Sequence, residues 1–83
     1  MNNELQTLIE ATLFGAGKSM SVDQLSQGLK TENKIVSEAL HGLQASLKRR
    51  RGGALQIVEI SGKWALEVKP SIADRLPKEA KTD

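Results

Sequence analysis

Residues 55–68 read LQIVEISGKWALEV, and this stretch decides the class of fold. Two runs rich in residues that favour β-strands flank an SGK segment, which begins at Ser61 and is typical of a hairpin turn. From Trp64 onward, large apolar residues alternate with polar or small ones, as in a strand that buries one face. Pro70 cannot donate a ladder hydrogen bond and is expected to end the second run. The stretch therefore predicts a β-hairpin.

Two segments near the N-terminus repeat their apolar residues with helical spacing. The first covers about residues 3–16, and the GAG sequence at its end is expected to stop the helix. The second follows Ser21, which begins an S-x-x-Q capping-box pattern. Gly28 suits a tight exit from this second, short helix.

A third, longer helix is expected to begin with Thr31 as its cap and Glu32 in its first turn, and to end at the glycine pair 52–53. The order of three helices and a C-terminal hairpin predicts an α+β winged helix, or winged helix-turn-helix, over residues 1–70. Residues 71–83 are expected to form a short helical stub and a linker or tail. The residues expected to be buried or half-buried are Leu8, Leu25, Leu40, Leu43, Trp64 and Leu66.

The bulk composition is that of one small domain. An 83-residue chain is long enough for a single thin core. It has no cysteine, which excludes disulfides and cysteine-ligated zinc. It has no apolar run of the roughly 20 residues that cross a bilayer, and its start lacks the features of a signal peptide. A soluble, cytoplasmic protein that does not bind membranes is therefore expected.

No constellation of residues points to catalysis or to a cofactor. The GKS sequence that begins at Gly17 resembles part of a phosphate-binding loop, but Thr12 stands where that motif needs glycine, and a helix precedes it. His41 is the single histidine, so converging histidine ligands for a metal are lacking. We predict that the domain is not an enzyme and has no catalytic residue, metal or cofactor.

One cluster of cations lies at the end of the third helix, Lys48, Arg49, Arg50 and Arg51. It is interpreted either as a solvated helix end that the helix dipole favours or as a contact with DNA phosphates. The outer face of the same helix carries Glu32 and Glu38 in the half that usually enters the major groove. These carboxylates would repel phosphates, so we predict weak, nonspecific DNA contact at most.

Three apolar residues are candidate contacts for a second copy of the chain. Phe14 lies nearly opposite Leu5 on the first helix, away from its main apolar stripe. On the first strand, Val58 and Ile60 alternate with Ile57, which leaves apolar groups on both faces. A hairpin with two apolar faces is more often covered on both sides than solvated on one. The alternative interpretation of Phe14 is packing at a frayed helix end.

Several stretches carry a family resemblance: LIEATLF at 8–14, VSEAL at 36–40 leading to Leu43, and LQIVEISGKWALEVKP at 55–70. In order and spacing they resemble the N-terminal domain of the segregation and condensation protein B family. Thr12 departs from the aliphatic residue of the family pattern, whereas Trp64 and Pro70 match its aromatic and closing proline. Members of that family carry two winged helices in tandem, and this chain resembles the first of them.

The resemblance implies a non-catalytic, architectural subunit of an SMC–kleisin complex for chromosome condensation and segregation. Such subunits form homodimers, largely through the first domain, and bind the kleisin subunit, which is ScpA-like. Through the kleisin they are linked to the SMC ATPase, and the ATPase activity belongs to that other subunit. The alternative, from a different functional class, is a winged-helix transcription regulator that binds DNA.

Overall fold

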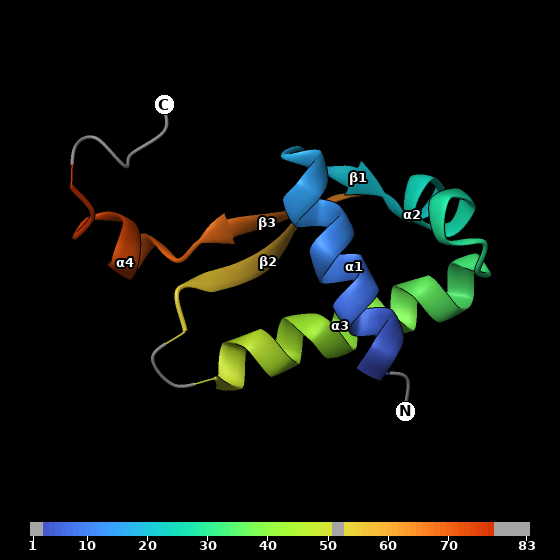
Figure 1. The fold of residues 1–83 in the computed structure, drawn as a ribbon, viewed down its shortest axis with the longest axis horizontal. Helices are drawn as coiled ribbons and strands as arrows, with labels where there is room; N and C mark the ends of the chain where they lie inside the picture. The colour runs from blue at the N-terminus through green and yellow to red at the C-terminus, as the bar shows by residue number, and fades with distance from the viewer. Residues whose placement is uncertain (1–2, 51–52, 78–83) are drawn as a thin grey trace.

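The computed structural model of the protein describes residues 3–50 and 53–77. Figure 1 shows the elements in chain order. They are α1 (Asn3–Ala16), β1 (Met20–Ser21), α2 (Val22–Leu29), α3 (Asn33–Arg49), β2 (Leu55–Ile60), β3 (Lys63–Val68) and α4 (Pro70–Ala73). Three helices and a β2–β3 hairpin lie where the sequence predicts them. None of the helices in the described part of the chain is long and apolar enough to cross a membrane.

The hairpin is antiparallel, and its register runs from Leu55 opposite Val68 to Ile60 opposite Lys63. Its turn consists of Ser61 and Gly62, whose φ angles are +53° and +79°. Two consecutive positive φ angles are the mark of the turn that matches the twist of a tight hairpin. Lys63, expected in the turn, is instead the first residue of β3.

The sheet has a third strand that the sequence did not reveal. Strand β1 pairs with β3, placing Met20 opposite Trp64, so the strand order is β1-β3-β2. The predicted two-stranded wing is thus present as β2 and β3, and β1 adds a third strand to its sheet. With only two residues, β1 is too short to show any alternation of apolar and polar side chains.

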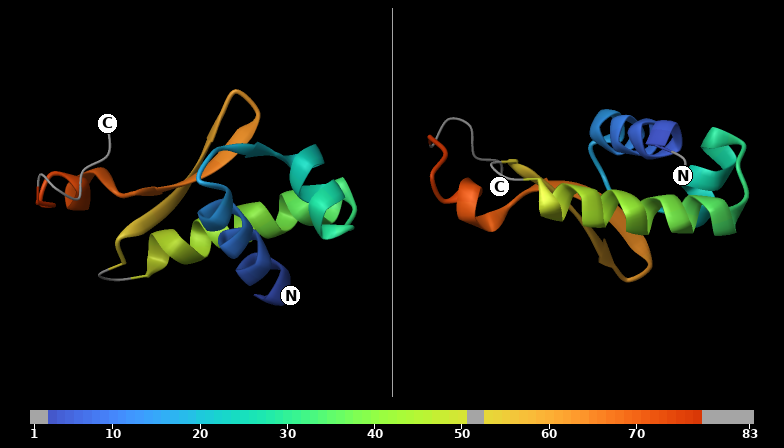
Figure 2. Two further views of the ribbon diagram at one scale, coloured as in Figure 1. Left: turned by 45° about the horizontal axis from the view of Figure 1, so that its top comes forward. Right: turned by 90° about the horizontal axis from the view of Figure 1, so that it is seen from below.

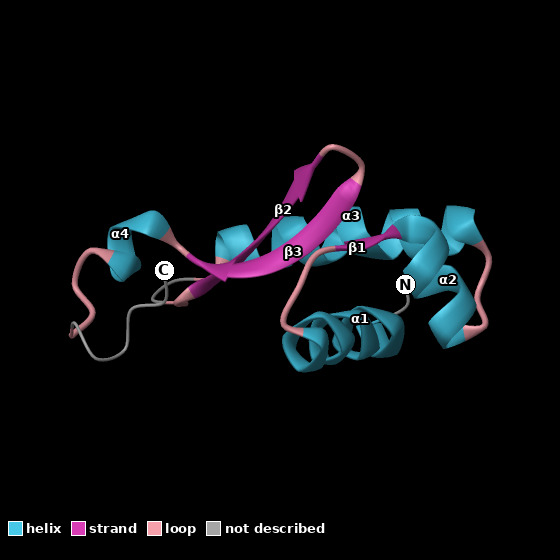
Figure 3. Cartoon of the chain, turned by 90° about the horizontal axis from the view of Figure 1, so that it is seen from above, coloured by secondary structure: helices cyan, strands magenta, loops and turns pink. Residues whose placement is uncertain are grey.

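The core lies where α1, α2 and the inner face of the hairpin meet α3. Figure 2 shows α1 lying across α3, and Figure 3 shows α4 at the opposite end of the molecule from α2. The buried residues are Leu5, Ile9, Leu13, Leu25, Val36, Ala39, Leu40, Leu43, Leu47, Ile57 and Trp64. Leu66 is half-buried against this cluster. Five of the six residues predicted to be buried or half-buried are thus confirmed.

Leu8 is the exception, since 47% of its surface is exposed. The buried stripe of α1 is narrow and consists of Leu5, Ile9 and Leu13, which follow each other at intervals of four residues. Leu8 lies beside that stripe rather than within it. Ile35 stands in the same relation to the stripe of α3 and is 38% exposed.

The helix caps agree with the sequence at α2 and differ at α3. Ser21 forms the expected capping box: its hydroxyl accepts from the Gln24 N–H at 3.1 Å, and its own N–H donates to the Gln24 side chain at 2.9 Å. The cap of α3 is Glu32, without a side-chain hydrogen bond, and so Glu32 is not in the first turn. Thr31 instead donates its hydroxyl to the Leu29 carbonyl at 3.1 Å.

The exit from α2 and the end of α3 also differ from expectation. The left-handed residue after α2 is Lys30, with φ +54°, and not Gly28. Helix α3 ends at Arg49, and the N–H of Arg50 donates to the carbonyls of Ser46 and Leu47. Of the glycine pair expected to end it, Gly52 lies outside the described residues.

The helical stub begins one residue earlier than predicted, at Pro70. Proline suits the first turn of a helix because the N–H that it lacks has no partner there. Residues 78–83 of the expected tail lie outside the described part of the chain.

Leu40→Ala is expected to lower the free energy of unfolding by about 2–5 kcal/mol, through lost burial and the cavity left behind. Leu40 is fully buried in the shared core. The matched control is Ile35→Ala, at an exposed position of the same helix, which should cost less than about 1 kcal/mol. Urea unfolding followed by the fluorescence of the buried Trp64 measures both. A Leu40→Ala midpoint equal to that of the parent would contradict this placement.

Candidate functional site

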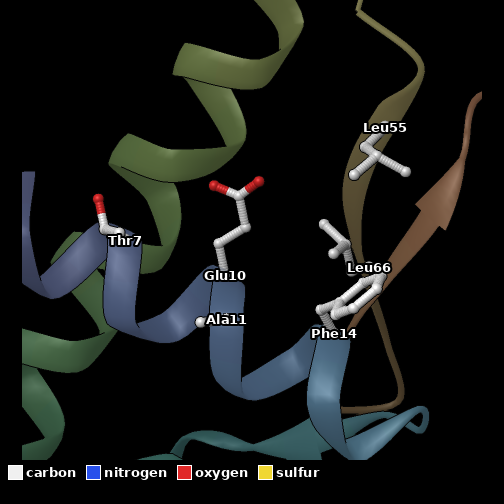
Figure 4. Close-up of a pocket in the computed structure, with 6 residues that line it drawn as sticks. All are labelled: Thr7, Glu10, Ala11, Phe14, Leu55 and Leu66. Carbon is white, nitrogen blue, oxygen red and sulfur yellow. The ribbon is translucent and has the colours of Figure 1, made fainter.

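The first candidate site is an open groove between α1 and the hairpin. It has a volume of about 330 Å³ and is lined by Thr7, Glu10, Ala11, Phe14, Leu55 and Leu66. Figure 4 shows that α1 supplies one wall and the two leucines of the hairpin supply the other. The four helical residues lie on one side of α1 because positions 10, 11 and 14 follow position 7 by three, four and seven residues, which is about one or two turns of a helix. The groove is therefore largely apolar, with one carboxylate at its side.

Phe14 stands at the edge of this groove, close to Leu66 (Figure 4), and 77% of its surface is exposed. It follows Leu13, the last residue of the buried stripe of α1, and one residue along a helix turns the side chain by about 100°. The core therefore cannot also bury Phe14. Phe14 is therefore not packed at the helix end, as the alternative interpretation of this residue expected. A large exposed apolar side chain next to an apolar groove is a candidate contact for a partner.

Val58 and Ile60 lie on the other face of the hairpin. Successive side chains of a strand point to opposite faces, so Leu55 and Ile57 share one face of β2 and Val58 and Ile60 share the other. Ile60 is 68% exposed near the turn, whereas Val58 is half-buried. The structure therefore does not bring the three candidate contacts together. Phe14 lies with Leu55, and the other two lie on the outer face.

A second groove, of about 170 Å³, lies between α3 and β2 and is lined by Gln44, Lys48, Gln56, Ile57, Val58 and Lys69. The side-chain amide of Gln44 donates to the Ile57 carbonyl at 3.2 Å, which ties α3 to the outer strand of the sheet. Val58 thus shares a groove with Lys48, the first residue of the basic cluster. The sequence did not show this juxtaposition, because α3 and β2 meet only through the fold.

The basic cluster is exposed in the part that the structure describes. Lys48 and Arg49 are in the last turn of α3 and Arg50 is its C-cap, while Arg51 lies outside the described residues. Cations in this position are favoured by the partial negative charge of the helix end. Glu32 is exposed at the opposite end of α3, and Glu38 is exposed in the N-terminal half of the helix, as the sequence predicts.

His41 is exposed but held in place. Its Nδ1 atom lies 2.8 Å from the Ser37 carbonyl oxygen. Its ring meets the buried Trp64 ring edge-on, with centroids 5.3 Å apart and an interplanar angle of 83°. The histidine therefore caps the core between α3 and β3, which is a structural role.

Among the described residues, no group of three or more histidine, aspartate or glutamate side chains could hold a metal ion. The GKS sequence from Gly17 lies in an exposed turn after α1, and Gly17 has a φ of +64°. A phosphate-binding loop needs a strand before it and a helix directly after it. Here α1 precedes the sequence and the two-residue β1 follows it.

Comparison with known proteins gives one consistent picture. The family model for the segregation and condensation complex subunit ScpB matches residues 7–83. Segregation and condensation protein B of Myxococcus xanthus (strain DK1622) is 29% identical over 68 residues, which are 82% of this chain and 20% of that protein. The chain thus spans about a fifth of the length of this curated relative.

Two solved structures share the fold. A dimer of the ScpB N-terminal domain complexed with a ScpA peptide matches with a TM-score of 0.81 and 27% identity, over 89% of this chain and 91% of that one. ScpB from Mycobacterium tuberculosis matches with a TM-score of 0.78 and 20% identity, over 100% of this chain and 54% of that one. The winged-helix fold predicted from the hairpin and the three helices is confirmed by the first likeness.

Replacing Arg49, Arg50 and Arg51 with glutamate is expected to leave the fold intact. Arg49 and Arg50, the two of these residues that the structure describes, are exposed. Losing a favourable charge at the helix end should lower the free energy of unfolding by at most about 1 kcal/mol for each residue replaced. For the parent chain we expect weak DNA binding that falls steeply with salt and does not depend on sequence. Circular dichroism and a mobility-shift assay at two salt concentrations measure these effects. Nanomolar affinity for one DNA sequence at physiological salt would refute the prediction.

Proposed function

Because the chain belongs to the ScpB family of segregation and condensation complex subunits, we propose that it is a non-catalytic, architectural subunit of an SMC–kleisin complex. It pairs with a second copy of itself and binds the kleisin, ScpA-like subunit. Through the kleisin it is linked to the SMC ATPase, which supplies the chemical energy. It acts in the cytoplasm, on the chromosome. The family resemblance drawn from the wing sequence is confirmed by the family match.

The observation that carries the proposal is the exposed Phe14 beside an open apolar groove. A symmetric dimer uses the same patch on both subunits, so a patch must offer both a projecting group and a recess to receive it. Phe14 is the projecting group, and the space between Ala11, Leu55 and Leu66 is the recess. Two copies related by a twofold axis can each seat Phe14 in the groove of the other.

Burial of this surface provides the driving force. Removing one phenylalanine side chain from water contributes about 1.5–3 kcal/mol, and a symmetric pair buries two. A stable protein interface needs about 1,200–2,000 Å² of buried surface in total. The rest of that area comes from the adjoining groove-facing side of α1 and the leucines of the hairpin. This thin domain thus extends its small core by sharing it with a second copy.

The alternative of a DNA-binding transcription regulator is not supported by the arrangement of charges. In a winged helix the N-terminal half of the third helix enters the major groove. Here that half exposes Glu32 and Glu38, while Lys48 and Arg49 lie at the far end. Carboxylates at the reading end oppose phosphate and base contacts. Any DNA contact is therefore weak and nonspecific.

Phe14→Glu is expected to weaken self-association by at least about tenfold, because a charge replaces the apolar group that enters the groove of the partner copy. Sedimentation equilibrium over a wide concentration range measures the association constant. The matched control is Ile60→Glu, which places the same charge at a similarly exposed apolar residue on the opposite face of the hairpin. It should leave the constant nearly unchanged.

The two variants separate the ways in which this proposal fails. A parent chain that stays monomeric at all accessible concentrations contradicts self-association through this domain. A parent dimer that survives Phe14→Glu but is lost in Ile60→Glu moves the interface to the outer face of the hairpin, where the other two sequence-predicted contacts, Val58 and Ile60, lie.

A further inference from the structure

The second groove has a different chemistry from the first, and we propose that it binds an acidic segment of the kleisin partner that also presents an apolar side chain. This assignment rests on the proposed function, because it names where the kleisin docks. The groove is formed by the end of α3, strand β2 and the residue that follows β3. It shares no lining residue with the groove that holds Phe14.

The floor of this groove is apolar and firmly held. Ile57 is only 2% exposed and Val58 is half-buried. The hydrogen bond from Gln44 to the Ile57 carbonyl keeps α3 against β2, so the floor is formed before a partner arrives. With a volume of about 170 Å³, the groove is smaller than the roughly 300–1,000 Å³ of small-molecule pockets. It has room for one aliphatic side chain of a peptide.

The walls of the groove are basic. Lys48 lines it from α3 and Lys69 lines it from the end of β3. Its six lining residues include no carboxylate, and Arg49 and Arg50 are exposed directly after Lys48. The nearby carboxylate of Glu67 accepts a hydrogen bond from the side-chain amide of Gln56 at 2.9 Å. Two cations from separate elements therefore flank an apolar floor and lack acidic partners within the groove.

This combination fits a peptide better than a nucleic acid. DNA phosphates are bound by rows of cations and hydrogen-bond donors, and the apolar side chain of Val58 offers them nothing. A peptide with carboxylates on either side of an aliphatic residue satisfies both the lysines and the floor. Such charge pairing at an exposed surface speeds and orients binding and is screened by salt.

The two grooves are lined by different residues, so the proposed kleisin site uses none of the groove residues proposed for pairing.

The test is calorimetric titration of the purified kleisin subunit into the chain and its variants. The double variant Lys48→Glu/Lys69→Glu is expected to bind at least about tenfold more weakly at low salt, and the difference should shrink at high salt. Val58→Ser should weaken binding several-fold by removing apolar floor. The matched control is Lys18→Glu/Lys34→Glu, which makes the same charge change at exposed lysines outside the groove. It should bind within about twofold of the parent.

Circular dichroism and sedimentation of each variant establish that it still folds and pairs. If the parent binds the kleisin and the Lys48/Lys69 variant binds equally well, the groove assignment is overturned and the proposed function stands. If the folded parent binds no kleisin, the proposed function itself fails, and this assignment with it. A short DNA duplex is the second probe. If the Lys48/Lys69 variant loses only DNA binding, the cluster is a nucleic-acid surface and the assignment is wrong.

Discussion

The apolar stripe of α3 is the support on which the rest of the structure depends. Helices α1 and α2 and strand β2 all pack against α3, and the stripe supplies Val36, Ala39, Leu40, Leu43 and Leu47 to the core. A chain of 83 residues with two aromatic side chains cannot build a second core. Helices α1 and α2 and strand β2 therefore take their positions from this one helix. The edge-on contact between His41 and the Trp64 ring extends the same support to the hairpin.

A single core that uses one side of each element leaves the other side of that element uncovered. Helix α1 buries Leu5, Ile9 and Leu13 and must then expose Phe14. The hairpin buries Ile57 and Trp64 and exposes Ile60. Exposed apolar side chains of this kind are candidates for contact with another molecule. The same packing that stabilises the domain therefore leaves exposed the side chains on which the proposed architectural role rests.

The two grooves differ because of the elements that form them. The groove beside Phe14 lies between two apolar surfaces and suits a copy of the chain. The groove beside Lys48 lies at the C-terminal end of α3, where cations gather in response to the helix dipole. Its floor is apolar because Ile57 and Val58 of β2 pass beneath that end. Packing on a single long helix therefore produces two grooves of different chemistry.

The sequence by itself determined the three main helices, the hairpin, the capping box at Ser21 and most of the buried stripe. These features depend on local periodicity and turn chemistry, which act within a few residues. It also identified Phe14 and the basic cluster as unusual. Only the tertiary structure decided that β1 joins the sheet, that Leu8 stays exposed and that Phe14 and Val58 lie in different grooves. The physical reason is that side chains far apart in the chain become neighbours only when α3 brings their elements together.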